Sequence, residues 1–203
     1  DIFSDIFGAT REQTPPRAQN LRGNDINYTL EVNLDDAFRG RLVSISLNRN
    51  QSNGKVMPER LRVRIPKGVD NGSKVRLAKK GEPGYNGGPP GDLYIVIKVR
   101  SHPVFERKGN NLHVSVPITF SEAALGSRVI VPTLEGETKM TVPEGTQGDQ
   151  IFRLREKGMP HLKGSEHGDL YVTVNVVVPK NLSDDSKLLV REFARMNPAN
   201  PRD

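Results

Sequence analysis

The sequence predicts a mainly β protein: two tandem, duplicated β-sandwich-like domains, each with one short helical turn, followed by a C-terminal amphipathic helix. Three observations support this fold class. The chain contains a long internal repeat, both copies alternate apolar and polar residues, and an apolar stripe at helical spacing lies near the end. Alternation with period two is typical of strands with one buried face, whereas a period near 3.6 indicates a helix.

The internal repeat begins in residues 62–99, which recur further along the chain at one constant spacing. The first-copy residues are Pro66, Gly68, Arg76, Leu77, Lys80, Gly81, Pro83, Gly91, Asp92, Leu93, Tyr94 and Val99; they meet identical residues at Pro143, Gly145, Arg153, Leu154, Lys157, Gly158, Pro160, Gly168, Asp169, Leu170, Tyr171 and Val176. A weaker match joins 32–40 to 118–126 at a longer spacing, so the first copy carries extra residues between Leu42 and Arg60. A solenoid usually needs at least three shorter repeats, so two long copies indicate two tandem domains.

Composition limits the possible functions. With 34% hydrophobic and 27% charged residues, the 203-residue chain fits a soluble globular protein, and no apolar run approaches the roughly 20 residues of a membrane helix. We therefore expect no membrane partner. The absence of cysteine excludes disulfides, thiolate zinc sites and a Cys nucleophile, and favours a reducing compartment. The net charge of +6 comes from scattered Lys and Arg residues, which favours solvated strand faces over a dedicated DNA groove.

The first residues, 1–25, are polar, contain Pro15-Pro16 and show no sustained period, which predicts a flexible linker. Ile2, Phe3, Ile6 and Phe7 fall at helical spacing within it. They either form an apolar turn that docks on a partner surface or belong to a Phe/Gly-rich tether, and we favour the tether.

The first copy follows, with inward positions that begin at Tyr28, Leu30, Val32 and Leu34. Asp35 and Asp36 then cap a helical turn that ends at Gly40. The expected strands are 28–34, 42–47, 61–65, 74–78 and 92–99, separated by a loop over 48–57 with Asn53-Gly54, by Pro66-Lys-Gly68 and by the Gly-rich loop 81–91.

Ser101-His-Pro103 marks the boundary to the second copy. Its expected strands are 111–119, 128–131, 137–142, 150–154 and 169–178, with one helical turn over 121–125. Ser183 then provides an N-cap with acids after it, and a helix with one apolar face, formed by Leu182, Leu189, Phe193 and Met196, runs up to Pro198. That face must pack either on its own domain or on a second copy of the chain.

Catalytic and metal chemistry find little support in the sequence. His161 and His167 lie near Glu166 and Asp169, but no spacing aims them at one point. The loop 81–91 lacks the pattern of a phosphate cradle, and no strained nucleophile elbow is visible. His102 lies at the boundary between the two domains, and His113 is expected to face water. We expect no enzyme, no metal and no cofactor.

An open sheet edge offers another route to function, because its unpaired N–H and C=O groups can accept an extended polypeptide while apolar pockets select bulky side chains. The competing interpretation is that Tyr28, Leu30, Ile45 and Leu47 simply fill the core. The pattern alone favours the core.

Several motifs carry a resemblance to a known family: the repeated Pro-x-Gly, the Lys-Gly-x-Pro loops, the two Gly-Asp-Leu-Tyr strands, Ser101-His-Pro-Val-Phe105 and Pro117-Ile-Thr-Phe-Ser-Glu-Ala-Ala-Leu-Gly126. Over about residues 26–197 the chain resembles the C-terminal substrate-binding region of the DnaJ co-chaperones. The resemblance implies four parts: 1–25 as the end of the Gly/Phe-rich linker, 26–103 as the client-binding C-terminal domain I, 104–180 as domain II, and 181–203 as the dimerisation helix and tail.

Two departures refine the resemblance. The chain has no Cys and only the short 48–57 loop where some members carry a zinc module, so it resembles a type II member. It also lacks a J domain with its His-Pro-Asp motif, since His102-Pro103 precedes Val104. We therefore expect this fragment to bind clients without by itself stimulating the ATPase of the partner chaperone.

The resemblance also implies site residues. The client groove of the first domain falls on Tyr28, Leu30, Ile45, Leu47 and Ile95. The repeat transfers these positions to a weaker second groove at Val114, Val116, Val131, Thr133 and Val172, where Pro132 removes a backbone donor from the edge. Dimerisation falls on Leu189, Phe193 and Met196.

The expected function is therefore that of a co-chaperone. We expect it to be a homodimer in the cytoplasm or in another reducing compartment, such as an organelle stroma. It would bind extended apolar segments of unfolded or misfolded polypeptides and deliver them to a DnaK-type chaperone. In some members lysines beside the groove bind the acidic tail of that chaperone, but Val43 stands where such a lysine is expected, so this role is not transferred. The alternative is non-specific DNA binding of the curved-DNA-binding type, which a pI near 9.6 permits.

Overall fold

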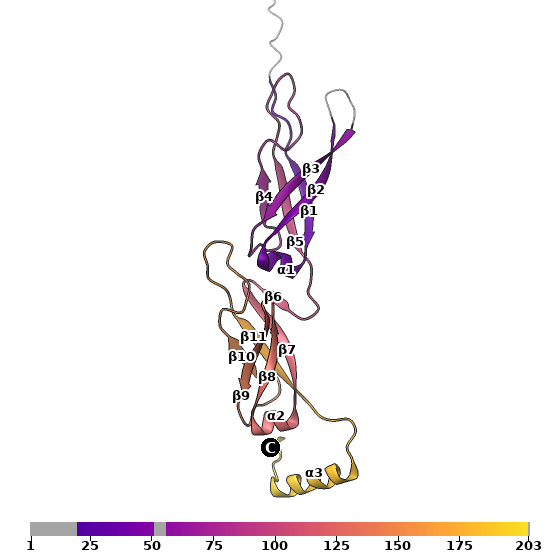
Figure 1. The fold of residues 1–203 in the computed structure, drawn as a ribbon, viewed down its shortest axis with the longest axis vertical. Helices are drawn as coiled ribbons and strands as arrows, with labels where there is room; N and C mark the ends of the chain where they lie inside the picture. The colour runs from indigo at the N-terminus through magenta and orange to yellow at the C-terminus, as the bar shows by residue number, and fades with distance from the viewer. Residues whose placement is uncertain (1–19, 51–55, 203) are drawn as a thin grey trace, which may run out of the picture. The chain divides into compact units, whose positions relative to one another are not determined.

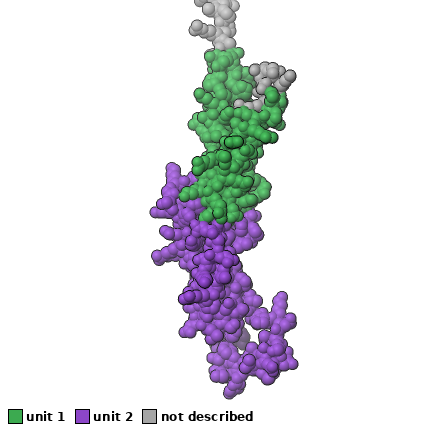
Figure 2. Space-filling model, viewed as in Figure 1, with its two compact units in different colours: residues 1–100 green, residues 101–203 purple. Residues whose placement is uncertain are grey.

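The computed structural model describes residues 20–50 and 56–202. The chain divides after Arg100 into two compact units, coloured separately in Figure 2. The sequence placed the domain boundary three residues later, at Pro103. Residues 1–19, with Ile2, Phe3, Ile6 and Phe7, and the Asn53-Gly54 pair lie outside the described residues.

Unit 1 contains two small sheets and one short helix (Figure 1). Its elements are β1 (Ile26–Val32), α1 (Leu34–Arg39), β2 (Arg41–Asn50), β3 (Val56–Ile65), β4 (Lys74–Leu77) and β5 (Leu93–Val99). One sheet has the strand order β1-β5-β4, with β1 parallel to β5, and the other is the antiparallel pair β2-β3.

Unit 2 repeats this plan and adds one strand and a helix. Its elements are β6 (Glu106–Lys108), β7 (Asn111–Thr119), α2 (Phe120–Leu125), β8 (Ser127–Thr133), β9 (Gly136–Val142), β10 (Ile151–Leu154), β11 (Leu170–Val177) and α3 (Asp184–Met196). The strand order β10-β11-β7-β6 contains the counterpart of β4-β5-β1, and β8-β9 corresponds to β2-β3. The duplication read from the sequence therefore holds for the topology, and the predicted fold class is confirmed.

Each unit has an aliphatic core between its two sheets, because each sheet has one apolar face that it buries against the other sheet. The inward residues alternate along the strands as the sequence predicted, for example Leu93, Ile95 and Ile97 on β5. Their counterparts Leu170, Val172 and Val174 on β11 are equally buried. Aromatic side chains contribute little to these cores, where Phe105 is the only buried Phe of the described residues.

The short helices end at a glycine in the left-handed region, Gly40 with φ of 71° and Gly126 with φ of 76°. A Cβ at Gly40 would lie 3.0 Å from the carbonyl oxygen of Ile65, so both the backbone angle and the packing favour glycine there. Thr119 starts α2 with a capping box, in which its hydroxyl accepts the backbone N–H of Glu122 and the Glu122 carboxylate accepts the backbone N–H of Thr119.

Two element boundaries in unit 1 were predicted wrongly. Leu34 was expected to end a strand, but it begins α1, with Asn33 as the N-cap and with Asp35 and Asp36 inside the first turn. The loop expected over 48–57 is shorter, because β2 runs to Asn50 and pairs there with Val56 at the start of β3. Leu34 keeps the alternation but is buried on a helix, and the polar end of β2 stays a strand because it pairs with β3.

Unit 2 differs from the prediction in three places. The strand β6, whose residues are Glu-Arg-Lys, was missed because it has no apolar alternation. The strand β8 continues through Pro132 to Thr133, with Pro132 opposite Glu137, so the proline does not end the strand. His113 is half-buried and stacks on Tyr171 of the neighbouring strand, with ring centroids 5.1 Å apart.

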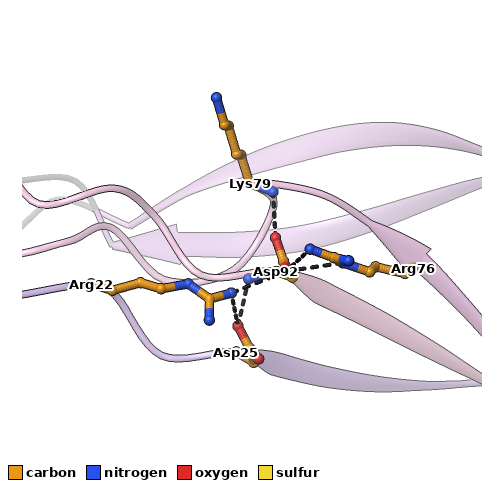
Figure 3. A network of polar contacts seen from close by, with 5 residues as sticks. All are labelled: Arg22, Asp25, Arg76, Lys79 and Asp92. Atoms are coloured by element: carbon orange, nitrogen blue, oxygen red, sulfur yellow. Dashed lines mark hydrogen bonds and ion pairs between the residues drawn. The ribbon is translucent and has the colours of Figure 1, made fainter.

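A buried carboxylate fixes the start of unit 1 to its Gly-rich loop (Figure 3). Asp92 is 4% exposed and accepts hydrogen bonds from the backbone N–H of Lys79 at 2.8 Å, from Arg76 Nε at 3.0 Å and from Arg22 Nη2 at 3.0 Å. The backbone N–H of Asp92 donates to Asp25. Residues 21–25, which the sequence assigned to the linker, are thus bound to the loop.

This arrangement predicts an acid-sensitive unit 1. The N–H of Lys79, followed by Arg76 and Arg22, lowers the pKa of Asp92 although burial raises it. A lowered folded-state pKa stabilises the protein above the unfolded value of about 3.9 and loses this effect as pH falls through the folded value. Thermal unfolding followed by circular dichroism should show a loss of unit 1 stability below about pH 4, and Asp92→Asn should be less stable at neutral pH with a shallower acid limb. An identical acid limb in the two proteins would contradict this role of Asp92.

Candidate functional site

The five predicted groove residues lie on three strands of unit 1, at two different depths. Ile45 on β2 and Ile95 on β5 are core residues, with 3% and 0% of their surface exposed. Tyr28 and Leu30 on β1 and Leu47 on β2 are half-buried. Tyr28 is the register partner of Ile95. The half-buried side chains are therefore the ones that offer apolar surface to a ligand.

The strands β1 and β2 are both sheet edges, since β1 pairs only with β5 and β2 only with β3 among the described strands. Proteins commonly protect such edges with charged residues or proline, because an open edge invites another chain to pair. The edge of β1 carries Glu31, whose carboxylate pairs with Lys98 and Arg100. The two remaining edges carry Arg60, Arg62 and Arg64 on β3 and Lys74 and Arg76 on β4.

The middle of the β2 edge, between Arg41 and Arg49, lacks such protection. Its residues 42–48 read Leu-Val-Ser-Ile-Ser-Leu-Asn, with neither a charged residue nor a proline. Val43 and Leu47 are half-buried on the inner face beside Ile45, while Ser44 and Ser46 are exposed on the outer face. An added strand could therefore pair with the backbone of β2 and place apolar side chains beside Tyr28, Leu30 and Leu47.

A cavity of about 520 Å³ opens at the start of β2, where α1 ends and beside the end of β3. Its lining combines apolar residues with cations: Arg39, Gly40, Arg41, Leu42, Arg64, Ile65, Pro66 and Lys67. Arg41 is bound to Asp36 at 3.1 Å, which neutralises part of this charge. Sequence reasoning missed the cavity, because Arg39 and Arg41 are far along the chain from Arg64 and Lys67.

The second unit is less suited to the same role. Val114, Val116, Val131 and Val172, the predicted lining of the weaker groove, are all buried, and Thr133 is half-buried. The strand β8, the counterpart of β2, carries Arg128 and Pro132 within its length. The equivalent edge of unit 2 is thus protected by charge and proline, and its inner side chains are covered.

The helix α3 exposes its apolar stripe. It has no buried residue, and Leu189 and Met196 are exposed on the face that also carries Phe193. Phe193 contacts Phe120 of α2 edge to face, with ring centroids 5.6 Å apart. One aromatic contact therefore links α3 to its own unit, and most of the stripe faces solvent.

The histidines do not assemble a site. His161 lies beside Asn110, with its Nδ1 atom 3.1 Å from Nδ2 of Asn110, and the backbone N–H of His161 donates to the backbone carbonyl oxygen of Glu166. The Nδ1 atom of His102 accepts hydrogen bonds from the backbone N–H groups of Val104 and Phe105. Residues 20–50 and 56–202 contain no group of three His, Cys, Asp or Glu side chains arranged to hold a metal ion. Among the described helices, none combines the length and apolar composition needed to cross a bilayer.

Comparison with known proteins shows to which family of proteins this chain belongs. The family model of the DnaJ C terminal domain matches residues 26–179. The chain therefore belongs to the DnaJ C-terminal domain family.

Curated relatives place the chain within longer proteins. It is 49% identical over 142 residues to the chaperone protein DnaJ of Brevibacillus choshinensis, covering 70% of this chain and 38% of that protein. The DnaJ of Ruminiclostridium cellulolyticum is 52% identical over 139 residues, covering 68% of this chain and 37% of the relative. The DnaJ of Exiguobacterium sibiricum is 47% identical over 156 residues, covering 76% of this chain and 42% of that protein. The chain thus spans about two fifths of the length of these relatives.

Proposed function

We propose that this chain is the client-binding part of a DnaJ-type co-chaperone, and that it holds extended apolar segments of unfolded polypeptides by adding them as a strand to β2. The single observation that carries the proposal is the uncharged edge of β2 over residues 42–48. Backbone hydrogen bonds at this edge would bind clients regardless of sequence. Tyr28, Leu30 and Leu47 would contact the apolar side chains of the client, with Ile45 and Ile95 as the floor beneath them.

The energetics favour weak and reversible binding. Burying one apolar client side chain contributes about 1.5–3 kcal/mol, and the loss of freedom of an extended client opposes it. A few such side chains give micromolar affinity, and the complex dissociates quickly. Fast release suits a protein that hands its client to a DnaK-type chaperone in a reducing compartment.

The test is the affinity of a fluorescently labelled, permanently unfolded polypeptide, measured by anisotropy at low and high salt. Leu30→Ser/Leu47→Ser should weaken binding at least about tenfold at both salt concentrations, because each substitution removes more than one methylene of apolar contact. The matched control Leu125→Ser/Leu162→Ser removes two exposed leucines of unit 2 and should leave affinity unchanged. Equal affinity in both double variants would refute the groove assignment.

The cationic cavity supports a second candidate function, non-specific DNA binding. Its four cations, Arg39, Arg41, Arg64 and Lys67, lie close together on one unit. Binding of duplex DNA that depends on them should weaken steeply with salt, because counterions are released, whereas apolar client binding should not. The salt series above, repeated with a labelled duplex, separates the two functions.

Unit 2 would bind clients weakly at most, since its lining valines are buried and its edge carries Pro132. The exposed stripe of α3, Leu189, Phe193 and Met196, would pack against the same stripe of a second chain. Such a dimer would place two unit 1 grooves on one long client and raise avidity without new contacts.

A further inference from the structure

A row of arginines lies on the outer face of β3. Arg60, Arg62 and Arg64 are exposed and alternate with the buried residues Leu61, Val63 and Ile65. Within residues 20–50 and 56–202, none of the three guanidinium groups has a hydrogen bond or an ion pair. We call these three residues the arginine row.

The register of the β2-β3 pair places short side chains beside the row. Arg62 lies opposite Ser44 and Arg60 opposite Ser46. An exposed serine leaves the space above β2 open, so an extended arginine side chain can cross it toward the free edge. No carboxylate lies on this face, whose described residues are Leu42, Ser44, Ser46, Asn48, Val56, Pro58, Arg60, Arg62 and Arg64.

A strand added to β2 would lie two strand spacings from β3, about 10 Å away. Its side chains would alternate between the two faces of the sheet. Those on the inner face would meet the apolar groove, and those on the outer face would lie beyond Ser44 and Ser46. An extended arginine and an extended glutamate side chain together span this gap.

The duplication provides an internal comparison. The counterparts of Arg60, Arg62 and Arg64 are Glu137, Lys139 and Thr141, and those of Ser44 and Ser46 are Ile130 and Pro132, in the same register across β8 and β9. Unit 2 therefore has two cations on this face, Lys139 and Arg128, the latter in place of Leu42, and it gains one acid. The row and the short serines occur together only in the unit whose edge is open.

We propose that the arginine row binds acidic side chains on the outward face of a client strand, so that the protein prefers extended segments in which apolar and acidic residues alternate. The inference rests on the proposed addition of clients to β2 and specifies their chemistry. Apolar residues at every second position enter the groove. The acidic residues between them pair chiefly with Arg60 and Arg62, across Ser46 and Ser44.

Polyanions such as duplex DNA are the competing ligands of the row. Its arginines, two residues apart on one strand, are spaced by about 6.7 Å. The peptide is favoured because the row flanks the open edge, and only Ser46 and Ser44 separate Arg60 and Arg62 from that edge, an arrangement that matters only to a ligand lying along β2. Glutamate peptide without apolar residues and duplex DNA are therefore included in the test.

The experiment compares three labelled peptides of equal length that share their apolar residues and alternate them with Glu, with Ser or with Lys. Exposed ion pairs contribute about 0.2–1 kcal/mol each, so the wild type should bind the Glu peptide about threefold to tenfold more tightly than the Ser peptide at low salt. The Lys peptide should bind more weakly than the Ser peptide. High salt should reduce these differences.

Arg60→Ser/Arg62→Ser removes the two arginines that lie opposite serines and should bind the Glu and Ser peptides nearly equally, with about the Ser affinity of the wild type. The matched control Arg128→Ser/Lys139→Ser removes the same charge from the equivalent face of unit 2 and should keep the preference for Glu. A preference that survives loss of the row overturns the inference, as does competition by polyglutamate or DNA as strong as that by the Glu peptide. Failure of the wild type to bind even the Ser peptide would instead refute the proposed strand addition.

Discussion

Leu189→Asp/Phe193→Asp is expected to be a monomer and to bind a long unfolded client about 10²-fold more weakly than the wild type, while its affinity for a short peptide stays the same. The reason is the exposed stripe of α3, whose only aromatic contact with its own unit, among the described residues, is that of Phe193 with Phe120. Two carboxylates in that stripe would be buried on dimerisation without a partner. Multi-angle light scattering gives the mass, and anisotropy with the short and long ligands gives the affinities.

The matched control is Arg191→Asp, which changes an exposed residue on the opposite face of the same helix. It should remain dimeric and keep the avidity for the long client. A wild type that is monomeric at micromolar concentration, or a double variant that stays dimeric, would contradict the dimer proposal without affecting the groove in unit 1.

Ile45→Asp is expected to unfold unit 1 rather than to impair client binding alone. Ile45 is a core residue, so the substitution buries a carboxylate and removes apolar packing, a combination that costs at least about 4 kcal/mol. Leu42→Asp on the same strand should change stability by no more than about 0.5 kcal/mol, since Leu42 is 61% exposed. Urea denaturation followed by circular dichroism measures both.

The transition of unit 2 should be unchanged in both variants. A folded Ile45→Asp protein with normal stability would show that position 45 is accessible, as a lining residue of an open groove would be. A loss of binding in this variant says little about the groove unless folding has been measured alongside it.

The repeat and the alternation were sufficient to predict the fold class, because both record a physical constraint, one buried face for each sheet. The strand β5 and its counterpart β11 were found within one residue at each end. Elements without an apolar pattern were missed or shortened. The strand β6 is charged throughout, and the end of β2 is polar but paired with β3.

The depth of the groove residues could not be read from alternation, since Leu30 and Ile45 follow the same pattern and differ only in what the facing layer covers. The arginine row was visible as Arg-Leu-Arg-Val-Arg-Ile over residues 60–65. Its position opposite Ser44 and Ser46, however, depends on the length of the hairpin, because a shift of register changes every cross-strand partner.

Amide hydrogen exchange with and without an unfolded client tests the central claim, that clients add as a strand to β2. In an antiparallel pair alternate N–H groups of β2 point away from β3 and lack a partner in the sheet. We expect these amides over residues 42–48 to become protected when client binds, while those of β8 do not change. Client binding with no added protection on β2, or with protection on another edge, would contradict the account.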